Sequence, residues 1–150
     1  MVQSRVSMTV RRVAAALSRY TLCELVLFGY SLVLLAMTSA ALRRRPPALL
    51  APRVRWQPSG AVRLLLRETS IARVSVVVAH AARLASGTCL SRALVTQSLL
   101  RAYGTEAAIV IGAKRNGARL AAHAWLEVDG HPIDGRHEQF TVLHVVKNER

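Results

Sequence analysis

Residues 86–134 constrain the fold of this chain more than any other stretch, because a helix pattern is followed by apolar runs that end at turn signals. Residues 90–103 are rich in Leu, Ala, Arg and Gln, which favour a helix, and Gly104 supplies a stop. Residues 107–112 and 119–128 are predicted strands, joined by a turn at Arg115-Asn116-Gly117. We therefore expect an α+β fold in which a helix packs on a small antiparallel sheet.

Cys89 lies in the first turn of the predicted helix, with Thr88 as the expected N-cap. The unpaired backbone N–H groups and the positive end of the helix dipole favour a thiolate at this position, which would make Cys89 a candidate nucleophile. The alternative interpretation is that Cys89 is a small buried hydrophobic residue at a helix start. Position alone does not separate the two.

His123 and Asp134 are the candidate base and its orienting carboxylate. Asp129-Gly130 is a strong signal for a two-residue turn, which would pair Glu127 with Pro132 and place Asp134 diagonal to His123 on the same sheet face. Glu127 shares this face but lies four residues from His123, about 13 Å along a strand. With Cys89 upstream, these residues have the types and order of a nucleophile, base and orienter in acyl transfer.

The order of these motifs resembles the transglutaminase-like branch of the papain-type fold: a cysteine in TCLSRALVTQSLLRAYG, a histidine in AHAWLEVDG and an aspartate on the next strand. More narrowly, it resembles the leader peptidases of lasso-peptide biosynthesis. The shared features are Cys-Leu, a helix ending in Leu-Leu-Arg-x-x-Gly, a strand ending in Ile-Gly, then Ala-His-Ala-Trp-Leu-Glu and Asp-Gly. The resemblance covers roughly Val76 to Leu143.

The resemblance implies a cysteine peptidase that removes the leader from a ribosomally made precursor peptide before a separate ATP-dependent cyclase closes the macrolactam. It assigns the catalytic triad to Cys89, His123 and Asp134, with no cofactor and no metal. The first eighty-odd residues lack the strand-and-turn pattern of a leader-recognition domain. The resemblance therefore implies a stand-alone protease with a separate leader-binding partner.

Residues 25–42 contain no charged side chain and are long enough to be a candidate membrane span. They also resemble a signal peptide with a cleavage site at Ser39-Ala40-Ala41, although Arg43-Arg44-Arg45 would oppose export. Small and polar residues interrupt the run, which favours a helix packed on the protease or on a partner. We expect a cytoplasmic protein, with membrane association through residues 25–42 as the alternative.

One domain with an N-terminal extension is expected: a helical, hydrophobic extension with a Pro- and Arg-rich linker over residues 1–55, followed by a protease domain over residues 56–150. Residues 59–85 are predicted to be helical. Residues 140–146 are a predicted edge strand, and residues 147–150 are expected to be frayed.

The net charge of +13 is carried almost entirely by arginine and would attract an acidic peptide, an anionic membrane or nucleic acid. We exclude nucleic acid as a partner because no stacking or recognition-helix motif accompanies the arginines. A disulfide between Cys23 and Cys89 would consume the nucleophile, so a reducing compartment is expected. The other histidines lack metal-ligand spacing, and we expect His80 on a helix surface and the three after residue 130 to be solvated: His131, His137 and His144.

Two further functions fit the same residues. One is acyl transfer to an amine instead of water, which the transglutaminase-like fold also supports. The other is a non-catalytic membrane or scaffold protein that retains the fold. Preferential labelling of Cys89 over Cys23 by a thiol-alkylating probe would argue against the second function.

Overall fold

The computed structural model describes residues 20–44, 60, 69–133 and 137–146. The described elements are three helices and four strands, which gives the α+β class expected from the sequence. In chain order they are α2 (Leu22–Arg44), α4 (Ile71–Leu84), α5 (Cys89–Ala102), β1 (Ala108–Asn116), β2 (Arg119–Val128), β3 (His131–Pro132) and β4 (Thr141–Val146). The expected linker at residues 46–58 and the expected frayed end at 147–150 lie outside the described residues.

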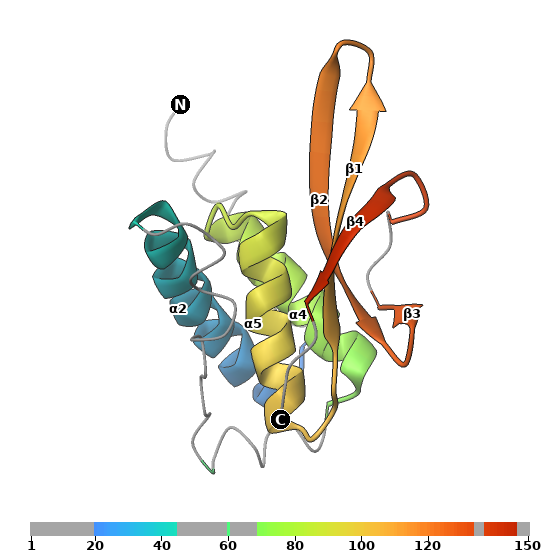
Figure 1. The fold of residues 1–150 in the computed structure, drawn as a ribbon. Helices are drawn as coiled ribbons and strands as arrows, with labels where there is room; N and C mark the ends of the chain where they lie inside the picture. The colour runs from blue at the N-terminus through green and yellow to red at the C-terminus, as the bar shows by residue number, and fades with distance from the viewer. Residues whose placement is uncertain (1–19, 45–59, 61–68, 134–136, 147–150) are drawn as a thin grey trace, which may run out of the picture.

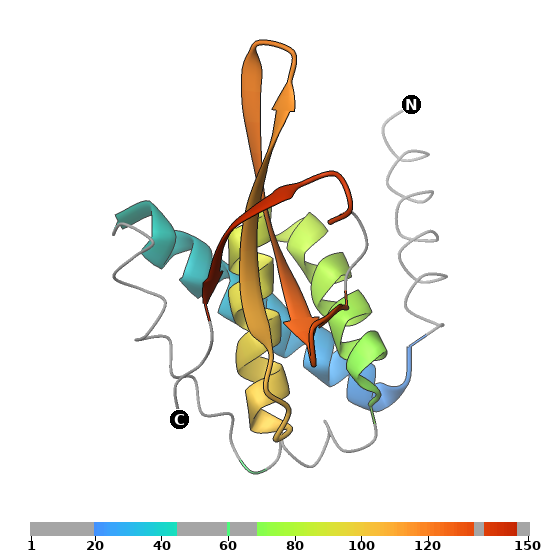
Figure 2. The same cartoon turned by 45° about the vertical axis from the view of Figure 1, so that its right-hand side comes forward.

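The helices lie on one side of the sheet, and the long β1–β2 hairpin extends beyond them (Figure 1). α5 packs against β1 and β2, while α2 packs against α4 and α5. α2 therefore forms the outermost helical layer, separated from the sheet by the other two helices, as the view in Figure 2 also shows.

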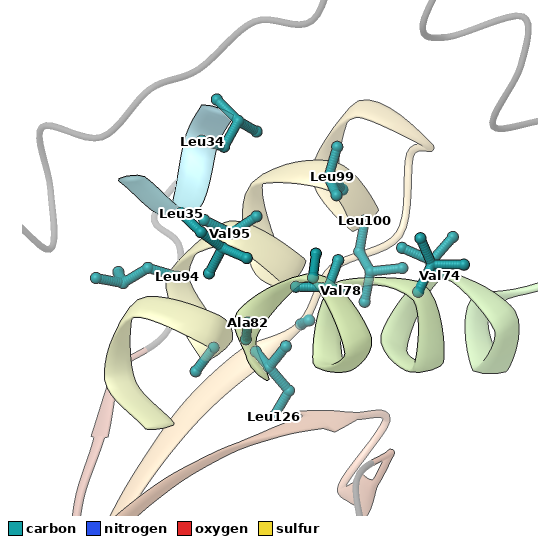
Figure 3. Close-up of a cluster of buried hydrophobic side chains, with 14 of the residues drawn as sticks. Leu34, Leu35, Val74, Val78, Ala82, Leu94, Val95, Leu99, Leu100 and Leu126 are labelled. Atoms are coloured by element: carbon teal, nitrogen blue, oxygen red, sulfur yellow. The ribbon is translucent and has the colours of Figure 1, made fainter. Parts of the chain in front are cut away.

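The core is built from Leu, Val and Ala side chains of all three helices and of the sheet face that they cover (Figure 3). Leu34 and Leu35 of α2, Val78 of α4 and Leu100 of α5 are at most 2 % exposed. Ala124 and Leu126 contribute from β2. The described part of the expected N-terminal extension is thus packed into the same core as the helix that carries Cys89.

α2 confirms the expected helix at residues 25–42 and extends it at both ends. Its start is a capping box: Thr21 Oγ1 accepts from the Glu24 N–H, and Glu24 Oε2 accepts from the Thr21 N–H. Glu24 Oε1 also accepts from Arg73 Nε of α4 at 2.6 Å, and this guanidinium lowers the pKa of the Glu24 carboxyl. The ion pair ties the beginning of α2 to α4. Within the described residues, α2 is the one helix long and apolar enough to cross a membrane.

α4 confirms the expectation that the valine run is helical, but not the continuous helix from residue 59 to 85. Ser70 has extended dihedral angles and caps α4 by accepting from the Arg73 N–H, so the helix begins at Ile71. A serine side chain that can cap a helix competes with its own backbone in a helix interior, which explains the break. Residues 61–68 lie outside the described part of the chain.

The sheet has the strand order β3-β2-β1-β4, and every pairing is antiparallel. β1 extends to Asn116, which pairs with Arg119. The turn predicted at residues 115–117 is therefore wrong, because Arg115 and Asn116 belong to the strand. The turn residues are Gly117 and Ala118, because Gly117 takes the positive φ of 62° that a two-residue hairpin turn needs. β4 confirms the predicted edge strand and pairs with β1 through an irregularity between Ile111 and Gly112.

The Asp129-Gly130 turn is confirmed with its predicted register. Asp129 and Gly130 have φ values of 52° and 77°, as a tight primed turn requires. Val128 pairs with His131 and Glu127 pairs with Pro132. The Ile133 N–H donates to the Leu126 carbonyl at 3.0 Å, so the pairing continues to the last described residue before the gap.

Candidate active site

Cys89 is the first residue of α5 and is half-buried, with a free thiol. Thr88 is the N-cap, as expected: its Oγ1 accepts from the Ser91 N–H at 3.1 Å. Ser91 is fully buried and donates its hydroxyl back to the Thr88 carbonyl at 3.0 Å, which fixes this turn from both sides. The N–H groups of Cys89 and Leu90 have no acceptor within the helix, so two backbone donors and the helix dipole lie next to the thiol.

A short connection positions this helix start. α4 ends at Leu84, Ser86 takes a positive φ of 49°, and the Gly87 N–H donates to the Ala82 carbonyl at 2.8 Å. A Cβ on Gly87 would lie 3.2 Å from the Ala82 Cβ and 3.3 Å from the Ser91 hydroxyl. The close approach of the two helices at this point therefore favours glycine two residues before the cysteine.

His123 is half-buried in β2, opposite Gly112 of β1. Its ring stacks on Trp125, with ring centroids 6.2 Å apart, and packs on Phe140, with centroids 5.1 Å apart. Ala124 and Leu126, which alternate with His123 along the strand, contact the helical core. His123 and Trp125 thus share the opposite face of β2, as the alternation in the sequence predicted.

Trp125 is a large, buried side chain on this face, at 2 % exposed. Its indole Nε1 donates to Glu127 Oε1 at 3.0 Å. The ring fills the space over Gly112, and the ring of His137 packs on it at 6.3 Å. Glu127 therefore has a partner of its own in Trp125, and the expectation that Glu127 does not orient His123 stays a prediction.

A pocket of about 580 Å³ opens beside His123. Lys114 Nζ donates to Gln139 Oε1 at 2.8 Å and lies 4.9 Å from the centre of the Phe140 ring. The described residues that line the pocket are Lys114, His123, Glu138, Gln139 and Phe140. The sequence reasoning did not assign Lys114, Gln139 or Phe140 to a site, because only the pairing of β4 with β1 brings residues 138–140 to the β2 histidine.

Asp134 lies outside the described residues, so its role stays a prediction. The residues before it follow the predicted register, with Ile133 hydrogen-bonded to Leu126. Cys89 and His123 lie on α5 and β2, two elements that pack against each other. Their described contacts differ, because Cys89 packs against the helical core whereas the His123 ring packs on Trp125 and Phe140. The structure thus packs the helix that carries Cys89 against the strand that carries His123.

The remaining histidines follow the expectations in three cases of four. His80 is exposed on α4, where the Tyr20 hydroxyl hydrogen-bonds to its Nδ1. His131 and His144 are exposed. The expectation that His137 is solvated is wrong, since its ring packs on Trp125 and its Nδ1 is buried, with no hydrogen-bond partner among the described residues. No group of His, Cys, Asp and Glu side chains with metal-binding geometry occurs in the described part of the chain.

A family model described as the transglutaminase-like superfamily matches residues 32–145. The match begins within α2, includes α4 and the helix that begins at Cys89, and continues through β1, β2 and β3 into β4. No curated protein and no solved structure matches the chain significantly.

Proposed function

Since the chain belongs to the transglutaminase-like superfamily, whose members include cysteine-protease-type enzymes, we propose that it is a cysteine peptidase that removes the leader from a lasso-peptide precursor. Its family is compatible with a cysteine peptidase and with an acyltransferase. The narrower assignment rests on the sequence motifs around Cys89 and His123 that resemble the leader peptidases.

One observation carries the proposal. Cys89 opens α5 behind a formed N-cap, on a helix that packs against the strand bearing His123. A half-buried thiol beside two backbone N–H groups without helical acceptors is the environment in which a cysteine becomes a nucleophile. The family of the chain and the order of Cys89 and His123 in the sequence favour this role over that of a structural cysteine.

In the proposed mechanism, His123 accepts the proton of the Cys89 thiol, and the sulfur attacks the scissile carbonyl carbon. The backbone N–H of Cys89 donates to the oxyanion that forms. The C–N bond then breaks as His123 returns the proton to the leaving amine, and a water molecule hydrolyses the thioester to regenerate the thiol. Asp134 orients His123 through its other ring nitrogen. None of these steps requires a metal or an organic cofactor.

The pocket beside His123 would receive a substrate side chain. Among its lining residues, Phe140 is apolar, and Lys114 and Glu138 carry opposite charges. The sequence before Cys89 is rich in Leu, Ala and Val and lacks the strand-and-turn pattern of a leader-recognition domain. We therefore propose a separate leader-binding partner, and a separate ATP-dependent cyclase that takes the freed core peptide.

The test uses the full chain, the precursor peptide and the leader-binding protein, with products identified by mass spectrometry. The wild-type protein should release leader and core peptide, whose masses together exceed that of the precursor by one water. Cys89→Ala should abolish cleavage, and Cys23→Ala should keep it. Equal loss of activity in the two variants would indicate that the cysteines act through packing, and the nucleophile assignment would then be wrong.

Adding a labelled primary amine separates the peptidase from the alternative acyltransferase. A peptidase gives free carboxyl termini whether or not the amine is present. An acyltransferase forms an amide between the amine and the acyl group, and the yield of this product rises with amine concentration. Cleavage should also rise when the partner is added, because holding the leader nearby raises its effective concentration to about millimolar.

A further inference from the structure

The outward face of α2 is apolar, whereas its inward face carries most of its polar side chains. At about 100° of rotation per residue, four exposed side chains fall within a sector of about 60°. They are Leu22, Val26, Val33 and Met37, which are 81 %, 48 %, 57 % and 49 % exposed and which we call the α2 stripe. Glu24, Ser31 and Thr38 lie on the opposite side and are buried. An ordinary surface helix has the reverse arrangement.

The location of α2 leaves the stripe pointing away from the rest of the fold. α2 contacts α4 and α5, which separate it from the sheet (Figures 1 and 2). Its buried positions occupy one side only, where Leu34 and Leu35 enter the core beside Val95 of α5 (Figure 3). The stripe is thus an exposed apolar row about 23 Å long from Leu22 to Met37, at 1.5 Å of rise per residue.

The charges point to the kind of surface that would cover this row. Arg43 and Arg44 are exposed in the last turn of α2, and no acidic residue lies between Glu24 and the end of the helix. The whole chain carries a formal charge of +13. An apolar row that ends in arginines on a basic protein is complementary to a bilayer with anionic headgroups, which offers an apolar interior and a negative surface.

We propose that α2 docks the protein flat on an anionic lipid bilayer, with the α2 stripe at the boundary of headgroups and acyl chains and with Arg43 and Arg44 among the headgroups. The other side of α2 packs on the protein core and is shielded from water, so it does not need charged side chains. A protein partner is the less suitable occupant, because the stripe has no side chain that can form the hydrogen bonds usual in a protein interface.

Docking of α2 on the membrane surface differs from crossing the membrane. α2 is also long enough to cross it. A spanning α2 would have to leave α4 and α5, which would expose the core side chains that Leu34 and Leu35 cover. It would also separate the ion pair of Glu24 with Arg73 or carry it into hydrocarbon. The structure therefore favours a helix that lies on the membrane and stays packed.

Docking through α2 leaves the pocket beside His123 accessible. The pocket opens on the sheet face that carries His123 and Trp125, whereas the helices cover the face that carries Ala124 and Leu126. A bilayer against the outermost helix would therefore lie on the side of the molecule away from the pocket. Peptide substrate and partner proteins could reach the pocket from solution.

The experiment is co-sedimentation of the full chain with vesicles, using phosphatidylcholine mixed with phosphatidylglycerol and phosphatidylcholine alone. We expect binding to the anionic vesicles and at least about tenfold weaker binding to the neutral ones. Val33→Glu combined with Met37→Glu should weaken binding to anionic vesicles by more than about tenfold, because two apolar contacts are replaced by charges that anionic lipids repel. Leu120→Glu, at an apolar position near the tip of the β1–β2 hairpin that is 75 % exposed, is the control and should keep binding.

Circular dichroism and thermal melting of each variant would verify that the fold is intact, and Arg43→Gln with Arg44→Gln would test the electrostatic part separately. Equal binding by the stripe variant and the wild type would overturn the proposal. So would an absence of vesicle binding together with a wild-type mass in solution above that of one chain, since the stripe would then cover a second copy. Retention in vesicles after alkaline carbonate extraction would show spanning instead of docking. None of these readouts depends on peptidase activity.

Discussion

The ring of Trp125 occupies the space that a side chain at position 112 would need. A Cβ placed on Gly112 would lie 2.8 Å from Cη2 and Cζ3 of the indole and 2.9 Å from the Thr141 carbonyl oxygen. Contacts this short require the ring or the β4 backbone to move. Because the ring of His123 stacks on Trp125, the absence of a side chain at Gly112 helps to determine where the candidate base lies.

Gly112→Ala should therefore lower both stability and activity. We expect a loss of about 2 kcal/mol in the free energy of unfolding, typical of overpacking in a buried site. Near-ultraviolet circular dichroism should report a changed Trp125 environment. Gly29→Ala is the control, since a Cβ there has no atom within 4 Å, and a helix gains stability from this exchange. Unchanged activity in Gly112→Ala would mean that Trp125 does not position the histidine.

His123→Ala should slow alkylation of Cys89 by iodoacetamide near neutral pH. If His123 takes the thiol proton, its removal decreases the fraction of thiolate, which is the reactive species. Alkylation of Cys23 in the same protein provides an internal reference, and peptide mapping by mass spectrometry separates the two sites. Identical rates at Cys89 in the wild type and the variant would show that the thiol and the imidazole are not coupled.

Asp134→Asn should decrease kcat by roughly ten-thousandfold, while Glu127→Gln and Asp129→Asn should decrease it far less. Glu127 already accepts the Trp125 indole N–H, and Asp129 forms the hairpin turn. The three exchanges are isosteric and each removes one carboxylate, so steady-state kinetics on the same precursor compares them directly. A larger effect of Glu127→Gln would assign the orienting role to Glu127.

Glu24→Gln should lower the melting temperature in a pH-dependent manner. Arg73 lowers the pKa of Glu24 in the folded protein below its ordinary value of 4.5. The ion pair therefore contributes its full stability at pH values above the ordinary pKa, where the carboxyl group is ionised in both the folded and the unfolded protein. The contribution is lost as the pH falls through the lowered pKa, where the folded protein takes up the proton. The difference in melting temperature between wild type and variant should therefore be constant near neutral pH and shrink in acid. A difference that grows in acid would contradict this assignment.

Thr38→Val should stabilise the protein. Thr38 is 3 % exposed, and its hydroxyl oxygen has no hydrogen-bond partner within the part of the chain that is described. Replacing it by the isosteric methyl group removes the cost of burying an unpaired hydroxyl, about 1 kcal/mol, which corresponds to about 3 °C in melting temperature. Ser31→Ala is the contrasting exchange, because the Ser31 hydroxyl donates to the Leu27 carbonyl at 2.7 Å. A decrease in melting temperature for Thr38→Val would mean that the hydroxyl is satisfied in solution.

The sequence alone determined the features that depend on neighbouring residues. Thr88 predicts the N-cap of α5 because its hydroxyl reaches an N–H three residues away. Asp129-Gly130 predicts the turn and the register of β3, since these two residues readily adopt positive φ. Alternation along β2 predicts that His123 and Trp125 share a face. The sequence predicts the first hairpin turn at Arg115-Asn116-Gly117, which is too early. Strand pairing continues to Asn116, so the turn begins only after that residue.

Only the tertiary structure decided which distant residues meet. The pairing of β4 with β1 brings Phe140 onto the ring of His123 and buries His137 against Trp125, and no local pattern indicates either contact. The ion pair of Glu24 with Arg73 joins residues 49 positions apart. An apolar run without a periodic pattern specifies a helix but not its buried side. The direction in which α2 faces was therefore fixed by its packing on α4 and α5, because burial depends on the whole core and turn chemistry depends on a few adjacent residues.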